Sequence, residues 1–138
     1  MMKFCVTLLL LYLSLLTATS IQCDYFNATI CTGEDTNFAL KNYGVCQFDA
    51  CGGDDVVVTT RSATNDAASC SGDTYMRLID TDGDLLGYSD DATWQEICSE
   101  IIFSLPVEYA CQTYESRIGC FGSDTDCAAQ VVVNVSGG

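Results

Sequence analysis

A short acidic segment, Asp80-Thr-Asp82-Gly-Asp84, carries carboxylates on alternate residues. Carboxylate oxygens with this spacing can converge on one hard cation such as calcium, which takes about six to eight oxygen ligands. The segment is not an EF-hand loop, because its glycine comes at the fourth place and Asp91, not a bidentate glutamate, comes at the twelfth. The alternative interpretation is a hairpin turn whose aspartates are solvated. Asp80, Asp82 and Asp84 are therefore candidate calcium ligands, with a plain turn as the alternative.

A second acidic candidate is made of two pairs of neighbouring aspartates, Asp90-Asp91 and Asp54-Asp55. Adjacent carboxylates at strand ends repel each other unless a cation or a network of donors lies between them. Asp90 and Asp91 are accordingly our second set of candidate calcium ligands. Calcium is the only cofactor that the sequence suggests.

Enzymatic chemistry has little support in this composition. The chain contains no histidine, which excludes Ser-His and Cys-His nucleophile pairs and leaves a carboxylate or Lys41 as the general base. A pair of carboxylates of the glycosidase type needs only to meet in space, but no cleft signature accompanies the nineteen acidic residues. We expect a protein without catalytic activity.

Several aromatic residues are candidates for a sugar-stacking or protein-contact surface, because their rings combine an apolar face with a polar edge. The alternative is that they are half-buried packing in a thin sandwich. Trp94 and Tyr88 are the candidate binding residues, since Trp94 is expected in a loop beside Asp90-Asp91, and loops on a rigid scaffold are where recognition usually occurs. The full set is Tyr75, Tyr88, Trp94, Tyr109 and Tyr114.

The first twenty residues indicate a secretory signal. Lys3 precedes an apolar run from Cys5 to Leu16, and Ala18 and Ser20 suit the −3 and −1 positions of a cleavage site after Ser20. The alternative, a membrane anchor, is disfavoured because a spanning helix needs about 20 apolar residues. We expect a secreted protein, extracellular or at the cell surface, that does not insert into a membrane after cleavage.

The chain that remains after cleavage has 118 residues, and its 4 basic and 19 acidic side chains give a net charge of −15. That length fits one domain. Nucleic acids and anionic membranes are bound through basic patches, so the charge argues against both as partners. The charge is compatible with cations, basic proteins and sugars, although scattered acids are also the ordinary means of keeping a surface soluble.

Cysteine density in a secreted chain of this length indicates a disulfide framework. Zinc is disfavoured because there is no histidine and no Cys-x-x-Cys pair. The number is odd, so one thiol is free or pairs with another chain. Spacing favours a loop closed by Cys120 and Cys127 and an N-terminal arm looped by Cys23 and Cys31, and leaves the other pairings open. The nine cysteines are Cys23, Cys31, Cys46, Cys51, Cys70, Cys98, Cys111, Cys120 and Cys127.

The elements that must position these residues are strands. Residues alternate from Thr74 to Ile79 and again from Leu85 to Tyr88, on either side of Asp82-Gly83, which predicts a β-hairpin. The segment 92–96, which holds Trp94, is either one helical turn or a loop, and 62–71 is expected to be a surface loop. Further strands are predicted at 43–48, 56–60, 100–105, 112–118 and 129–135. No amphipathic helix is evident, so we predict an all-β sandwich.

Two Asn-X-Ser/Thr sequences, at Asn27 and Asn134, are N-glycosylation acceptors and indicate exposed positions. In the last strand, alternation directs Val131, Val133 and Val135 inward and Val132 and Asn134 outward. The sequon and the alternation therefore agree that the face of this strand that carries Asn134 is exposed to solvent.

The chain resembles the bacterial pre-peptidase C-terminal domain family, in a cysteine-rich form typical of secreted eukaryotic proteins. The resemblance extends over about residues 43–135. It rests on Cys51-Gly-Gly-Asp54 before a valine strand, Gly72-Asp73-Thr74-Tyr75-Met76-Arg77-Leu78-Ile79-Asp80, Asp82-Gly83, Tyr88-Ser89-Asp90-Asp91, and also Cys70-Ser-Gly-Asp73 and Cys111-Gln-Thr-Tyr114 through Gly119-Cys120.

This resemblance implies a jelly-roll-like, disulfide-stabilised sandwich that performs no chemistry and helps to attach or position a secreted enzyme; similar collagen-binding modules carry calcium. The chain departs from that arrangement because no catalytic domain accompanies the module. The expected organisation is a signal peptide at 1–20, an N-terminal arm at 21–42 and a sandwich domain of this type at 43–138.

Three functions remain open from the sequence. The first is a non-enzymatic secreted glycoprotein of extracellular or cell-surface structure that acts by adhesion or self-assembly, as a homo-oligomer or filament. Its support is the odd cysteine, the two sequons and a terminal valine strand that could pair with a neighbour at a sheet edge. The second is a soluble calcium-dependent module that binds carbohydrate or protein. The third, a small secreted enzyme, serves only for contrast.

Overall fold

A computed structural model describes residues 18–28, 38–93, 95–122 and 126–138. All of its regular elements are strands, which confirms the predicted all-β class. The strands are β1 (Thr19–Gln22), β2 (Phe26–Ala28), β3 (Gly44–Ala50), β4 (Asp55–Thr59), β5 (Ser69–Ser71), β6 (Thr74–Ile79), β7 (Leu85–Ser89), β8 (Glu100–Ser104), β9 (Gln112–Cys120), β10 (Cys127–Gln130) and β11 (Val132–Ser136).

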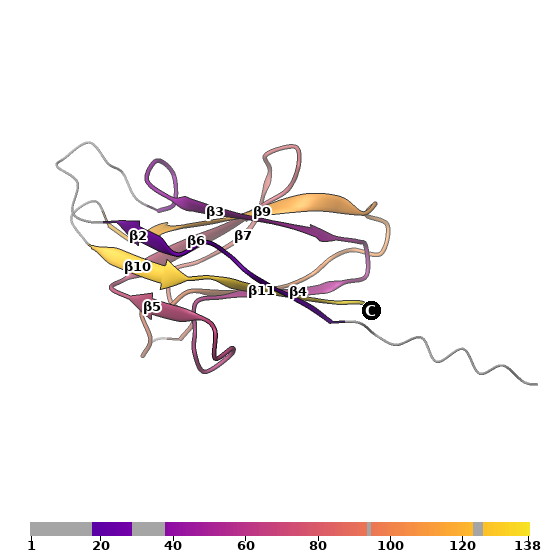
Figure 1. The fold of residues 1–138 in the computed structure, drawn as a ribbon. Helices are drawn as coiled ribbons and strands as arrows, with labels where there is room; N and C mark the ends of the chain where they lie inside the picture. The colour runs from indigo at the N-terminus through magenta and orange to yellow at the C-terminus, as the bar shows by residue number, and fades with distance from the viewer. Residues whose placement is uncertain (1–17, 29–37, 94, 123–125) are drawn as a thin grey trace, which may run out of the picture.

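Two four-stranded sheets and one three-stranded sheet make the fold (Figure 1). We call the order β3-β9-β6-β7 the β9 sheet and the order β1-β11-β4-β8 the β11 sheet. The third sheet, β2-β10-β5, continues the β11 sheet beyond Val131, where the last predicted strand divides into β10 and β11. Figure 1 shows β3 and β9 in one layer and β10, β11 and β4 in the other.

The core lies between these layers because each strand directs alternate side chains inward. Met76 and Leu78 of β6 meet Val56 and Val58 of β4 in one hydrophobic cluster. Phe48 and Tyr114 stack on each other within it, with ring centres 5.9 Å apart. Buried side chains from both layers thus confirm the sandwich, which its disulfides stabilise.

The predicted hairpin is present as β6 and β7, in antiparallel register with Arg77 opposite Tyr88. Gly83 has φ of +88°, the left-handed conformation that the tight turn requires. The turn is closed by two backbone hydrogen bonds, from the amide of Asp80 to the carbonyl of Asp84 and from the amide of Gly83 to the carbonyl of Asp80. This hairpin brings the start of β6 beside the end of β7, which is where the candidate site lies.

The terminal strand differs from our expectation in two ways. β11 lies between β1 and β4, so it is an interior strand of its sheet and has no free edge to offer a neighbour. Val132, expected to be exposed, is fully buried. Val131, Val133 and Val135 do face the core, as predicted. The wrong edge assignment arose because the partner strand β1 lies in the segment that we expected to be cleaved or to form an arm.

The segment expected as an N-terminal arm contributes strands to the sandwich. β1 pairs with β11, and β2 pairs with β10. The predicted cleavage position after Ser20 falls within β1, while residues 1–17 of the predicted signal lie outside the described residues. The loop predicted at 62–71 ends in a further short strand, β5.

Four disulfides join Cys23 to Cys46, Cys51 to Cys111, Cys70 to Cys98 and Cys120 to Cys127. The predicted Cys120–Cys127 loop is confirmed. The predicted Cys23–Cys31 pair is wrong, because Cys23 bonds to Cys46 and thereby ties the end of β1 to β3 across the sandwich. Cys31 lies outside the described residues. Disulfides in this number form in an oxidising compartment.

No helix in the described part of the chain is long and apolar enough to cross a membrane.

Candidate functional site

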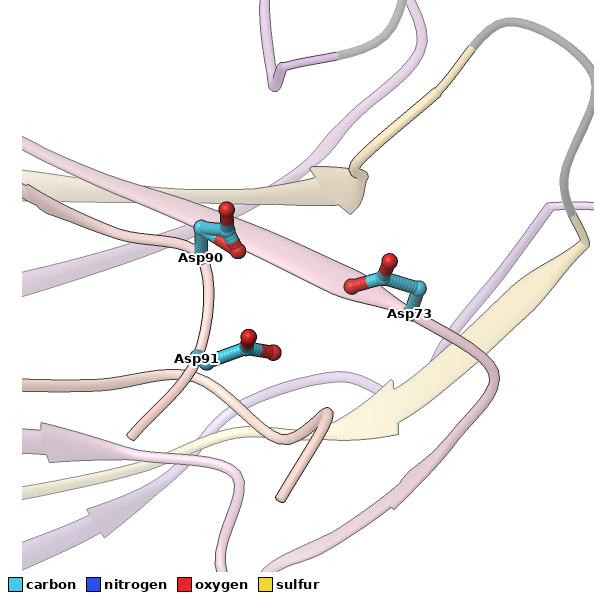
Figure 2. Close-up of side chains that lie close together, drawn as sticks. All are labelled: Asp73, Asp90 and Asp91. Carbon is cyan, nitrogen blue, oxygen red and sulfur yellow. The ribbon is translucent and has the colours of Figure 1, made fainter. Parts of the chain in front are cut away.

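Three aspartates meet at one end of the β6–β7 hairpin. Asp73 directly precedes β6, and Asp90 and Asp91 directly follow β7. One carboxylate oxygen of each lies within 4.8 Å of the others. Figure 2 shows the carboxylates of Asp73 and Asp91 turned toward each other, with Asp90 beside them. We call these three residues the acidic cluster.

Asp73 is held by a tight backbone contact at Gly72. A side chain on Gly72 would come within 2.1 Å of the carbonyl oxygen of Asp126, and Gly72 has φ of +72°, so only glycine fits. The amide of Phe121 donates a hydrogen bond of 3.0 Å to the carbonyl of Asp73. The start of β6 is therefore fixed against the end of β9.

Asp90 and Asp91 are held through the buried Ser99. The hydroxyl of Ser99 lies 2.8 Å from the carbonyl oxygen of Asp90 and 2.9 Å from that of Thr74. The amide of Ala92 donates to the carbonyl of Cys98 at 2.7 Å. Because Cys98 is bonded to Cys70, the segments that carry the three aspartates are joined covalently as well.

The acidic cluster forms no ion pair among the described residues, whose ion pairs are those of Arg61 with Glu96 and Glu100 and of Arg117 with Glu115. Asp73 Oδ1 is buried and has no hydrogen-bond partner in the part of the chain that the structure describes. Burial raises the pKa of Asp73, and the charges of Asp91 and Asp90 raise it further. Burial, together with Asp91, also raises the pKa of Asp90. The arrangement therefore favours either a proton or a bound cation.

The predicted site at Asp80, Asp82 and Asp84 is a hydrogen-bonded turn. Asp80 Oδ1 accepts hydrogen bonds from the amides of Asp82 and Asp84, at 3.0 and 2.8 Å, so it serves its own backbone. The carboxylates of this turn do not come together in the described structure as those of the acidic cluster do. They line an open hollow with Tyr109 and Gln112.

Asp54 and Asp55, the other pair considered, lie away from Asp90. Asp54 Oδ2 accepts a hydrogen bond of 2.8 Å from the amide of Cys51, and Asp55 accepts one from the hydroxyl of Ser104. Asp55 pairs with Ser104 at one end of the β4–β8 ladder, whereas Ser89, next to Asp90, is bonded to Glu100 at the other. Each residue of this pair has a structural partner.

Three exposed aromatic rings, packed around the buried Tyr75, lie next to the acidic cluster on the outer side of the β9 sheet. Tyr75 and Tyr88 are stacked, with ring centres 5.9 Å apart, and Phe38 contacts both Tyr75 and Phe121 edge to face, at 5.4 and 5.1 Å. Tyr88 is 65% exposed, Phe38 39% and Phe121 37%. We call these four residues the aromatic patch.

The aromatic patch adjoins the acidic cluster along the chain, because Tyr75 follows Asp73 by two residues and Tyr88 precedes Asp90 by two. Phe38 reaches it through Gly119, which stands opposite Tyr75 in the sheet. A side chain there would come within 3.0 Å of the Ala39 backbone, so Gly119 lets this segment lie on the sheet. Arg77 holds the segment by a 2.6 Å hydrogen bond from Nε to the carbonyl of Phe38.

The other aromatic candidates are dispersed. Tyr114 is in the core, 1% exposed, so its predicted place in a contact surface is wrong. Tyr109 lies near the turn at Asp80–Asp84, and Trp94 lies outside the described residues. Sequence reasoning missed Asp73, Phe38 and Phe121 as site residues. Only Asp73 carried a signal, the Gly72 before it.

No protein-family model matches the chain, and no curated protein matches it in a sequence search.

Proposed function

We propose that this protein is a non-enzymatic secreted module of extracellular or cell-surface structure, which acts by adhesion through the aromatic patch and the acidic cluster. The observation that carries the proposal is a group of exposed aromatic rings beside carboxylates that no cation neutralises among the described residues. Aromatic rings flanked by polar groups are the residues that protein and sugar recognition uses most.

The scaffold supports this proposal because it holds the surface in place before a partner arrives. Gly72, Gly119 and Ser99 fix the three segments that carry the rings and the carboxylates, and the Cys70–Cys98 and Cys120–Cys127 disulfides lie beside them. A surface that is already ordered loses little conformational entropy on binding. The residue types also favour binding over catalysis, since the chain has no histidine.

The test is adhesion of beads coated with the protein, to one another and to arrays of immobilised glycans and extracellular proteins. We expect adhesion that is lost in the double variant Tyr88→Ser/Phe121→Ser and kept in Tyr109→Ser, a matched control that is 39% exposed at the other end of the hairpin. Equal loss in both variants, no adhesion at all, or turnover of a substrate by the purified protein would contradict the proposal.

Self-assembly is the form of this proposal that the cysteines support. The four disulfides use eight of the nine cysteines that follow residue 20, which leaves Cys31 for a bond between chains. Electrophoresis without reductant then shows dimers that collapse to monomers on reduction, and Cys31→Ser removes them. A monomer with one free thiol in native material excludes covalent assembly.

Calcium-dependent binding is the second candidate, and the buried, unpartnered Asp73 Oδ1 favours it. Carboxylates within 4.8 Å of one another offer the oxygen ligands that calcium takes. We expect millimolar calcium to raise the melting temperature, because a ligand that binds only the native state stabilises it. Asp73→Asn and Asp90→Asn abolish that rise, whereas Asp82→Asn in the hairpin turn keeps it. No rise in the wild type excludes the site.

A further inference from the structure

The outer side of the β11 sheet contains one apolar row with a glycosylation acceptor in it. Directly opposite one another across the four strands are Ile102 of β8, Val57 of β4, Asn134 of β11 and Ser20 of β1. Ile102 is 72% exposed, and Val57 and Asn134 are partly exposed. All four lie on one face, because residues in register across a sheet point to the same side.

The residues beside this row on the same face are mostly polar and hydrogen-bonded, and the one apolar side chain among them, Val132, is fully buried. On one side the hydroxyl of Thr59 donates to Glu100 at 3.0 Å. On the other side the hydroxyl of Ser104 donates to Asp55. Ile102 and Val57 therefore form a narrow strip of accessible apolar surface across this face.

Asn134 is placed to cover this strip. It belongs to an interior strand, so a group attached to it rises from the middle of the face and not from its edge. Its side-chain amide makes no hydrogen bond within the described residues and is free to be modified. Ile102 lies two strands away, about 10 Å, within reach of the first sugars of an N-glycan. The carbon-bound hydrogens of a sugar ring form an apolar side that packs on aliphatic side chains.

We propose that an N-glycan on Asn134 lies along this row, covers Val57 and Ile102, and closes the outer face of the β11 sheet to other proteins. The open face is then that of the β9 sheet, which carries the aromatic patch. This inference is independent of the adhesive function, because it concerns the opposite sheet. Asn27 provides the internal comparison: it lies on the edge strand β2, opposite Ala128 and Ser71, with no large apolar side chain in its row.

The experiment produces the full chain in a secreting eukaryotic cell as wild type, Asn134→Gln, Ser136→Ala and Asn27→Gln. Intact mass before and after a glycosidase reports occupancy of each site. Binding of a fluorescent apolar dye and sedimentation velocity report exposed apolar surface and self-association. Ser136→Ala keeps Asn134 while removing the acceptor sequence, and glycosidase treatment of the folded wild type removes the glycan without any substitution.

We expect loss of the Asn134 glycan by any of the three routes to raise dye fluorescence about two-fold and to increase self-association. The reason is that an exposed apolar strip binds both the dye and a second copy of the protein. Adding Ile102→Thr to Asn134→Gln reverses the increase, and Asn27→Gln causes none. A wild type that carries no sugar on Asn134 overturns the proposal. So does an unchanged dye signal after the Asn134 glycan has been removed, or an equal rise on loss of the Asn27 glycan.

Discussion

Two groups of acidic residues take members from the same segment, 89–100, and differ in their hydrogen-bond and ion-pair partners. Asp73, Asp90 and Asp91 form the acidic cluster on one side. On the other side Glu96 and Glu100 share Arg61, which contacts both carboxylates. The buried Ser99 lies between the two groups, bonded toward Asp90 through its hydroxyl and toward Thr60 through its amide.

The comparison teaches that burial raises the pKa of a carboxylate here unless hydrogen-bond partners outweigh it. Burial opposes ionisation of Glu100, yet hydrogen bonds from Thr64, Thr59 and Arg61 outweigh it and lower its pKa. Burial raises the pKa of Asp73, whose neighbours are two further negative charges. Glu96 and Glu100 already have positively charged and hydrogen-bonding partners in the folded protein and stabilise it. The acidic cluster has no positively charged partner among the described residues. Uncompensated charges of this kind are typical of binding sites.

Removing the disulfide that borders both groups should have the largest effect. In Cys70→Ala/Cys98→Ala we expect the free energy of unfolding to fall by about 3.5 kcal/mol, from the loss of a cross-link over 28 residues. Denaturant unfolding measures it. Cys120→Ala/Cys127→Ala, with a separation of 7 residues, is the matched control and should cost about 2.4 kcal/mol by the same relation. An equal or reversed order would show that loop closure does not set these stabilities.

Neutralising Glu100, which has hydrogen-bond and ion-pair partners, should have an intermediate, destabilising effect. Glu100→Gln keeps the shape but loses charge-assisted hydrogen bonds, and we expect about 1–2 kcal/mol less stability at pH 7. Because the folded pKa of Glu100 lies below its ordinary value of 4.5, its contribution is present above that value and is lost as pH falls through the folded pKa. Unfolding of both proteins at a series of pH values from 7 downward should therefore show the difference shrink below pH 4.5, as the pH falls through the folded pKa. A constant difference would assign the loss to packing.

Much of the fold followed from local pattern. The alternation in Thr74–Ile79 and Glu100–Ser104, and the positive φ that Asp82-Gly83 supplies, depend on neighbouring residues alone, and the structure confirms both strands and the turn. The Cys120–Cys127 loop is short enough to be read in the same way.

What failed required contacts between distant parts of the chain. β11 was taken for an edge because its partner β1 lies more than a hundred residues earlier, and Cys23 was paired with Cys31 because Cys46 is close only in the folded sandwich. Aspartates at alternate positions left a calcium loop and a plain turn open at Asp80–Asp84, and the structure adds that Asp80 accepts hydrogen bonds from the amides of its own turn. Asp73 joins Asp90 and Asp91 only when the hairpin closes. Phe38 joins Tyr75 only when Ala39 lies over Gly119.

The smallest effect is expected when Asp73 of the acidic cluster is neutralised, and this change should raise the free energy of unfolding where the previous two lower it. The folded pKa of Asp73 lies above its ordinary value of 3.8. Its protonated form therefore stabilises the protein below that value, and the contribution is lost as pH rises through the folded pKa. At pH 7, with a chelator present, Asp73→Asn should raise the free energy of unfolding by less than about 1 kcal/mol, because it removes a charge that neighbours of like sign oppose.

The pH dependence and a matched control make this gain specific to the acidic cluster. Below pH 3.8 Asp73 is protonated in the folded and the unfolded chain, so the advantage of Asp73→Asn should vanish there. Asp82→Asn, which removes a charge in the exposed hairpin turn, should give no comparable gain at pH 7. A loss of stability in Asp73→Asn would mean that this carboxylate already has a favourable partner, and the contrast with Glu100 would then be false. A gain at pH 7 that disappears in acid shows instead that the folded protein tolerates three close carboxylates at a cost in stability, which a bound cation would remove.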